Sequence, residues 1–159
     1  MANQRTSRTL SALLLFFILV VGGGWGIGAT NLPGGWYAGL SKPFFNPPNW
    51  LFAPVWTVLY VLIAFGGWRT FADQPKSPAR ALWCVQLALN FLWSPVMFTG
   101  HAIGAALGVI TLLLLSVVGF VAVQWHRDRI AAVLFIPYLA WVAFAWLLNF
   151  SLYRLNGSF

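Results

Sequence analysis

The stretch IGAALGVITLLLLSVVGFVAVQ, residues 103–124, is the part of the sequence that decides the fold. It contains no charged side chain, and it matches the ~20 predominantly apolar residues that a helix needs to cross the hydrocarbon core of a bilayer. Inside that core every backbone polar group must find a partner within the protein, which a helix provides from its own backbone. The stretch therefore predicts a membrane-spanning helix.

Four other stretches of the chain have the same apolar character. Of the 159 residues, 60% are hydrophobic and only two are acidic, and the mean hydropathy is +0.80, which does not fit a soluble domain. We therefore predict an all-α membrane protein, a five-helix transmembrane bundle in which residues 1–159 form a single domain. The spans are expected at 10–29, 49–70, 81–99, 103–124 and 130–152.

The basic residues indicate an orientation. Two of the nine, Lys42 and Arg154, fall on the side of the C-terminus, and the other seven fall on the side of the N-terminus: Arg5, Arg8, Arg69, Lys76, Arg80, Arg127 and Arg129. Because basic residues are enriched on the cytoplasmic side of membrane proteins, the N-terminus is predicted to be cytoplasmic. The net charge of +7 does not indicate a nucleic-acid partner, since the charges lie at span ends rather than on one soluble face.

The N-terminal segment has a second interpretation. Arg5 and Arg8 precede an apolar run, Leu10 to Val21, and small residues follow, as in a secretory signal peptide. The apolar character continues to Ala29, however, and the whole stretch is long enough to span a bilayer. We predict that the segment is retained as the first span.

The first connection, residues 30–48, differs from the short connections between the other spans. It is too rich in proline and glycine to continue a helix, yet it is too apolar for a freely solvated linker. We predict a stiffened lid over a ligand pocket; the alternative is an aromatic belt at the headgroup level of the membrane. The residues concerned are Pro33, Gly34, Gly35, Pro43, Pro47 and Pro48, with the apolar Trp36, Tyr37, Leu40, Phe44 and Phe45.

Three spans carry polar, small and aromatic residues at helical spacing, so that each set shares one helix face. Polar side chains are costly in hydrocarbon and must face partners. If the three faces meet, they line an apolar cavity with a few hydrogen-bonding groups, which is typical of a site for a flat small molecule. The alternative is that the amides join helices, at about 0.6 kcal/mol each. The sets are Gln86, Asn90, Trp93 and Met97; Tyr138, Trp141, Ala145 and Asn149; and Trp50, Ala53, Thr57, Tyr60 and Ala64 with Trp56 beside them.

The sequence offers no residues for a metal site or for ordinary enzymatic catalysis. His101 and His126 lie in opposite connections, without Cys or carboxylate at metal-ligand spacing. Asp73 and Asp128 also lie in connections, so no carboxylate within a span can relay protons or act as an acid or base. We predict no metal, no catalytic residue and no required cofactor.

Glycines recur at four-residue spacing within the spans. Such pairs allow helices to approach closely, either within the bundle or between two protomers. The pairs are Gly22 and Gly26, Gly24 and Gly28, and Gly104 and Gly108.

Four motifs follow one another along the chain: WYAGLSKPFFNPPNW at 36–50, PVWTVLY at 54–60, QLALNFLWSPVMF at 86–98 and IPYLAWVAFAWLLNF at 136–150. Together they resemble the tryptophan-rich sensory protein family, whose animal members are the mitochondrial translocator proteins, also called peripheral-type benzodiazepine receptors. The resemblance implies a five-helix bundle, commonly a homodimer, with a pocket open toward the first connection. It also implies ligands: porphyrins such as protoporphyrin IX and haem, sterols, and synthetic drugs.

The same resemblance implies roles for particular residues. The loop Trp is expected to cover the ligand, indole faces to stack on it, and the amide of the third span to donate a hydrogen bond to it. By resemblance these ligand-binding positions are Trp36, Trp56, Tyr60, Asn90, Trp141 and Ala145. Phe150 stands where the sterol pattern of animal members has Tyr, so tetrapyrrole binding is favoured over sterol binding.

The sequence therefore predicts an integral membrane porphyrin-binding protein that acts as a sensor, regulator or transporter of tetrapyrroles. The alternatives are light- and oxygen-dependent degradation of bound protoporphyrin IX, sterol or lipid binding, and a passive membrane scaffold. Helical spans favour the bacterial inner membrane, while the resemblance leaves the outer membrane open.

Overall fold

The computed structural model describes the backbone of residues 2–73 and 76–157 and the side chains of residues 10–72 and 76–157. The side chains of Arg5 and Arg8, two of the basic residues that indicate the orientation, and of Asp73, one of the two carboxylates, lie outside the described residues.

The described chain is built from helices, and no strand occurs within it. Its seven α-helices are α1 (Ala2–Phe17), α2 (Gly23–Thr30), α3 (Gly35–Gly39), α4 (Phe52–Asp73), α5 (Pro78–Ser94), α6 (Ile103–Arg127) and α7 (Arg129–Asn156). Short irregular helical turns join α1 to α2 at Ile18–Gly22, precede α4 at Asn49–Leu51 and extend α5 at Pro95–Thr99.

Five stretches are long and apolar enough to cross a bilayer, which confirms the predicted all-α class with five spans. They begin and end within a few residues of the predicted boundaries, and three of them are longer by several residues at one end or both. The stretches are Leu10–Thr30, Asn49–Ala72, Pro78–Thr99, Ile103–Arg127 and Arg129–Asn156.

Capping residues explain why the turns at one end of the bundle are so short. Ser77 accepts a hydrogen bond from the Ala79 backbone N–H at the start of α5, and Pro78 occupies the first helical position. Asp128 caps α7 in the same way, and its carboxylate also receives two hydrogen bonds from Arg69 of α4, at 2.9 and 3.1 Å. The ion pair thus ties the turn between α6 and α7 to the end of α4.

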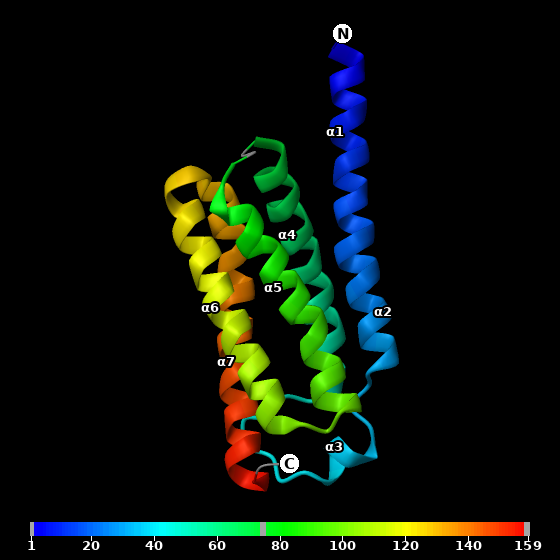
Figure 1. Ribbon diagram of the computed structural model, residues 1–159. Helices are drawn as coiled ribbons and strands as arrows, with labels where there is room; N and C mark the ends of the chain where they lie inside the picture. The colour runs from blue at the N-terminus through cyan, green and yellow to red at the C-terminus, as the bar shows by residue number, and fades with distance from the viewer. Residues whose placement is uncertain (1, 74–75, 158–159) are drawn as a thin grey trace.

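The spans pack as a bundle of α4 to α7 with the first span along one side (Figure 1). α6 lies between α5 and α7, and α1 and α2 lie against α4, with α2 also touching α5. The N-terminus and C-terminus lie at opposite ends of the bundle, and α3 lies at the end where the C-terminus is found (Figure 1). In the most apolar 18 residues of the first span, only 11% of the residues are buried, against 28–33% in the other four spans. The first span therefore packs most loosely.

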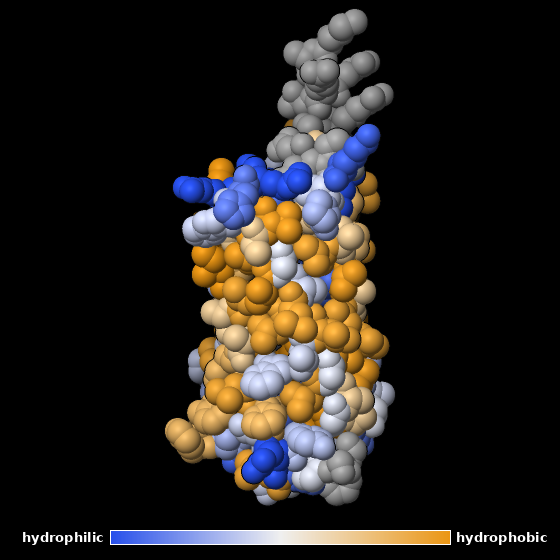
Figure 2. Space-filling model, turned by 60° about the vertical axis from the view of Figure 1, so that its left-hand side comes forward, coloured by the Kyte–Doolittle hydropathy of each residue, from blue (hydrophilic) through white to orange (hydrophobic). Residues whose placement is uncertain are grey.

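The outer surface matches a lipid environment. Large apolar side chains are exposed along every span, including Leu14, Trp25, Leu115 and Val133. Figure 2 shows one face, on which apolar residues form a broad band and polar residues gather at both ends. A surface of this kind is stable in hydrocarbon and would aggregate in water, so the chain is a multi-pass integral membrane protein.

Candidate ligand pocket

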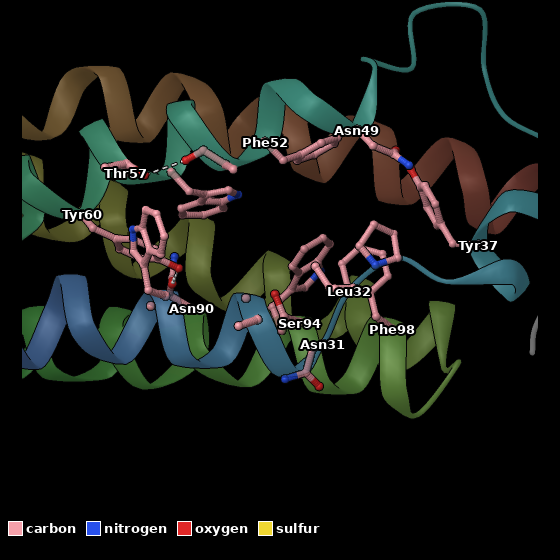
Figure 3. Close-up of a pocket in the computed structure, with 18 residues that line it drawn as sticks. Asn31, Leu32, Tyr37, Asn49, Phe52, Thr57, Tyr60, Asn90, Ser94 and Phe98 are labelled. Carbon is pink, nitrogen blue, oxygen red and sulfur yellow. Dashed lines mark hydrogen bonds between the residues drawn. The ribbon is translucent and has the colours of Figure 1, made fainter.

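A cavity of about 340 Å³ lies between α2, α4 and α5, close to α3 and the first connection (Figure 3). Its volume is within the range of small-molecule sites, about 300 to 1,000 Å³. Its walls are mainly apolar and aromatic, with a few amides and hydroxyls. The lining residues are Gly24, Trp25, Gly28, Ala29, Asn31, Leu32, Pro33, Tyr37, Asn49, Phe52, Ala53, Trp56, Thr57, Tyr60, Asn90, Trp93, Ser94 and Phe98.

Aromatic rings form the flat surfaces of the cavity. Trp56 and Tyr60, one turn apart on α4, are stacked with their ring centroids 5.3 Å apart and an angle of 29° between the rings. Trp93 and Phe98 contribute rings from the α5 side and meet edge to face at 5.6 Å. Rings held in this way offer broad π-faces to a flat ligand.

A buried chain of hydrogen bonds begins at one end of the cavity. The Tyr60 hydroxyl donates to Asn90 Oδ1 at 3.2 Å, and Figure 3 shows the two side chains meeting across that end. Asn90 Nδ2 donates to the Tyr138 hydroxyl at 3.0 Å, and Tyr138 donates to Gln86 Oε1 at 2.8 Å. Asn90 thus turns its Oδ1 toward the cavity-lining Tyr60 and its Nδ2 toward Tyr138, and donation from Asn90 to a ligand stays a prediction.

Gly24 allows the first span to close the cavity. A Cβ atom at this position would lie 2.2 Å from the ring of Tyr60, far inside van der Waals contact, so only glycine lets α2 approach α4 here. Gly22 and Gly26, on the other side of the helix, have open space at the corresponding point. Of the pair Gly24 and Gly28, Gly24 thus makes a contact within the bundle, whereas a Cβ atom at Gly28 would meet nothing within 4 Å.

The first connection lies over the other end of the cavity. Tyr37 of α3 is buried, lines the cavity and donates a hydrogen bond to Asn46 Oδ1 at 2.9 Å. Burial raises the pKa of the Tyr37 hydroxyl, so the group remains a donor throughout the physiological pH range. Asn156, at the end of α7, exchanges two hydrogen bonds of 2.9 Å with the backbone of Ser41. The connection is thus anchored at several points, as a lid would require, although its movement stays a prediction.

Three of the six residues assigned by resemblance line the cavity: Trp56, Tyr60 and Asn90. The other three do not. Trp36 stacks on His101, with ring centroids 4.3 Å apart. Trp141 packs edge to face on Phe52 and leaves its buried Nε1–H without a partner among the described residues.

Ala145 is the third residue outside the cavity. It is buried behind the wall formed by Trp56 and Asn90, next to a void of about 10 Å³. The role of Trp36, Trp141 and Ala145 in ligand binding stays a prediction.

The structure corrects one feature of the predicted pocket. The third wall comes from α2 and not from α7, because α7 packs closely on α4 and α6 and fills the space beside them with Tyr138 and Val142. The periodic pattern also placed Trp50 wrongly, since it is 72% exposed and does not line the cavity. Sequence reasoning missed the contribution of the first span, although the pair Gly24 and Gly28 indicated a close helix contact there.

Among the described residues, no group of three or more His, Cys, Asp or Glu is placed to hold a metal ion. The polar groups of the cavity are amides and hydroxyls, which suit hydrogen bonding to an organic ligand.

The chain matches known proteins over most of its length, including all the residues that line the cavity. Residues 13–154 match the sequence profile of the TspO/MBR family. The chain is 36% identical over 152 residues to protein CrtK of Rhodobacter capsulatus, covering 93% of this chain and 94% of that protein. It is 39% identical over 147 residues to the tryptophan-rich sensory protein of Cereibacter sphaeroides, with 92% and 93% covered. It is also 38% identical over 127 residues to the translocator protein of Homo sapiens, with 76% and 75% covered.

Proposed function

Because this chain belongs to the TspO/MBR family, we propose that it is a membrane sensor or transporter that binds a tetrapyrrole in the cavity between α2, α4 and α5. The names of its relatives, sensory protein and translocator protein, support the general role. The cavity supports the choice of ligand, since its stacked Trp56 and Tyr60 offer an aromatic wall for a flat macrocycle.

The shape of the cavity supports a partly enclosed ligand. Trp25 and Leu32 line it and are 60% and 69% exposed, so the cavity is open on the side where these two residues lie. A macrocycle can place one edge against Tyr60 and Asn90 while the opposite edge extends past Leu32. Lys42 lies over the ring of Tyr37, with Nζ 4.9 Å from the ring centroid, and so places positive charge near the end where acidic side groups would emerge.

A fluorescence-quenching titration of the purified protein with protoporphyrin IX tests this proposal. We expect saturable quenching, and a dissociation constant raised about fivefold in Asn90→Ala, which loses one polar contact at the cavity wall. Trp141→Ala should have a smaller effect, because Trp141 reaches the cavity only through Phe52. Trp125→Ala, at the far end of α6, is the matched control. Quenching that does not saturate, or identical curves for all four proteins, would contradict the proposed site and mean that the aromatic residues serve only in helix packing.

A second candidate function is light- and oxygen-dependent breakdown of the bound porphyrin. The observation that favours it is the presence of three indoles in the cavity wall, from Trp25, Trp56 and Trp93, because indoles are readily oxidised. Absorption spectra of the complex recorded in light and in darkness separate the two functions. Loss of the porphyrin band only under illumination supports breakdown, and an unchanged spectrum supports binding alone.

Orientation and assembly belong to the same proposal. Arg69, Arg80, Arg127 and Arg129 lie toward the end of the bundle where α4 ends and α5 begins, which supports placing the N-terminus in the cytoplasm of a bacterial inner membrane. Gly22 and Gly26 are exposed and have open space around them, which supports a homodimer formed through the first span.

A further inference from the structure

A buried polar chain crosses the bundle behind the cavity and ends at a residue that does not line it. The chain passes from Tyr60 on α4 to Asn90 on α5, then to Tyr138 on α7 and back to Gln86 on α5. Tyr138 and Gln86 are fully buried, and Tyr60 and Asn90 are 8% and 5% exposed. Gln86 therefore acts on the cavity-lining Tyr60 only through Tyr138 and Asn90, which lie between the two.

The single hydrogen of a tyrosine hydroxyl fixes the direction of this chain. Tyr138 donates its hydrogen to Gln86 Oε1, at 2.8 Å, and must therefore accept from Asn90. That requirement turns the Asn90 amide so that Nδ2 faces Tyr138 and Oδ1 faces Tyr60. Tyr60 then donates its own hydrogen to Asn90 Oδ1. What Tyr60 then offers the cavity is the free lone pair of its hydroxyl oxygen, which can only accept a hydrogen bond, while the second Nδ2 hydrogen of Asn90 lies on the side of Tyr138.

We propose that Gln86 is a positioning residue that makes this end of the cavity a hydrogen-bond acceptor, so that the pocket selects ligands with an O–H or N–H donor on the edge that enters first. The inference rests on the proposed function, because it assumes that the cavity takes a macrocyclic ligand. Gln86 touches no ligand itself; its carbonyl oxygen determines which way Tyr138 donates.

Removing the acceptor at position 86 reverses the chain. In Gln86→Leu the Tyr138 hydroxyl has Asn90 Oδ1 as its remaining acceptor, so the Asn90 amide turns over and Nδ2 donates to Tyr60. The Tyr60 hydrogen is then free to point into the cavity. The wall changes from acceptor to donor, and the preferred ligand edge changes from donor to acceptor.

Three dimethyl esters of porphyrins make a matched set of probes for this reversal. They share one uncharged macrocycle and differ at two edge positions, which carry vinyl groups in the protoporphyrin ester, 1-hydroxyethyl groups in the haematoporphyrin ester and acetyl groups in the diacetyldeuteroporphyrin ester. The hydroxyethyl groups can donate, the acetyl groups only accept, and the vinyl groups do neither.

Quenching titrations with the three esters test the proposal. The wild-type protein should bind the hydroxyethyl ester about fivefold more tightly than the acetyl ester, and Gln86→Leu should reverse that order. Gln86→Glu should keep the wild-type order, because a carboxyl oxygen still accepts from Tyr138. Tyr138→Phe should bind the two esters about equally, because Asn90 is then held in neither orientation.

The control is Gln124→Leu, which removes the other glutamine that is fully buried among the described side chains; Gln124 donates to Thr70 at 2.7 Å, away from the cavity. It should lose stability to a similar extent as Gln86→Leu and keep the wild-type order of affinities. The same order in the wild-type protein and in Gln86→Leu, or no order in the wild-type protein, would overturn the role of Gln86. If the wild-type protein bound none of the three esters saturably, the proposed function would fail as well, and with it this inference.

Discussion

Two buried asparagines, Asn90 on α5 and Asn149 on α7, occupy the inner faces of their spans and have different surroundings. Asn149 of α7 accepts from Trp93 Nε1 at 3.0 Å and donates to the Ile103 backbone oxygen at 3.1 Å, so it joins three spans. It is 1% exposed and borders no described cavity. Asn90 is nearly as buried and also joins three spans, but one side of its hydrogen-bond chain ends at open space.

The difference comes from the helix that covers each asparagine. α5, α6 and α7 pack tightly around Asn149, whereas Asn90 and Tyr60 are covered by the loosely packed first span. The same residue type therefore joins helices at one position and borders a pocket at the other. The comparison shows that the free space beside a buried amide, and not the amide itself, indicates a ligand site.

The largest expected effect comes from disturbing the helix that covers Asn90. Gly24→Ala places a Cβ atom 2.2 Å from the Tyr60 ring, so either α2 moves away or the ring moves into the cavity. Overpacking of this kind costs about 1–3 kcal/mol of stability. A ring displaced into the cavity imposes a penalty of that size on binding, which corresponds to a porphyrin affinity lower by about fivefold to 160-fold. Quenching titration measures the change in porphyrin affinity. Gly26→Ala, where a Cβ meets nothing within 4 Å, should bind as the wild-type protein does.

Replacing each of the two asparagines by alanine in turn distinguishes their roles. Asn149→Ala leaves Trp93 Nε1 and the Ile103 oxygen without their partner and should lower stability by about 1–3 kcal/mol, with little change in affinity. Asn90→Ala should show the opposite balance, with the larger change in affinity. Thermal unfolding in detergent and quenching titration of both variants measure the two quantities. Equal effects of the two variants on affinity would mean that both amides serve only to join helices.

A smaller effect is expected from loosening the first connection. Asn156→Ala removes two exposed hydrogen bonds to the Ser41 backbone, which together are worth about 0.5 kcal/mol at this level of exposure. If the connection acts as a lid, stopped-flow measurements should show porphyrin leaving about twice as fast. An unchanged dissociation rate would favour the aromatic belt over the lid.

The smallest effect is expected far from the cavity. Burial alone would raise the pKa of Asp128, but the hydrogen bonds from Arg69 and from the backbone of α7, with the charge of Arg69, together hold that pKa below its usual value. The ion pair therefore stabilises the protein above about pH 4, and the contribution is lost as the pH falls through the lowered pKa. Asp128→Asn should remove about 0.5 kcal/mol of stability at neutral pH and leave porphyrin affinity unchanged. Unfolding measured between pH 3 and 7 checks the sign, because the difference between the two proteins should vanish at the acid end.

The periodicity of the sequence placed individual residues on helix faces better than it placed the faces against one another. It put two sets of four residues each on one side of a span, and six of the eight are buried, while the two tryptophans are half-buried. The sets are Gln86, Asn90, Trp93 and Met97 on the third span, and Tyr138, Trp141, Ala145 and Asn149 on α7. It could not show that the first span and not α7 forms the third wall. That choice depends on the fit of Gly24 against the Tyr60 ring, a contact between residues far apart in the chain.

Likewise, resemblance to a family can suggest which residues meet a ligand but not how each is held in this chain. Trp56 and Tyr60 lie where the resemblance implies, on the cavity wall. The orientation of the Asn90 amide follows from Tyr138 and Gln86 on other turns and another span, and no pattern within one helix encodes it.

A structure of the protein with protoporphyrin IX bound tests the central claim most directly. We expect the macrocycle to lie between α2 and the pair α4 and α5, in contact with Trp56 and Tyr60 and with one edge near Asn90. A macrocycle bound against Trp141 and Ala145 on α7, or on the outer surface of the bundle, would contradict it.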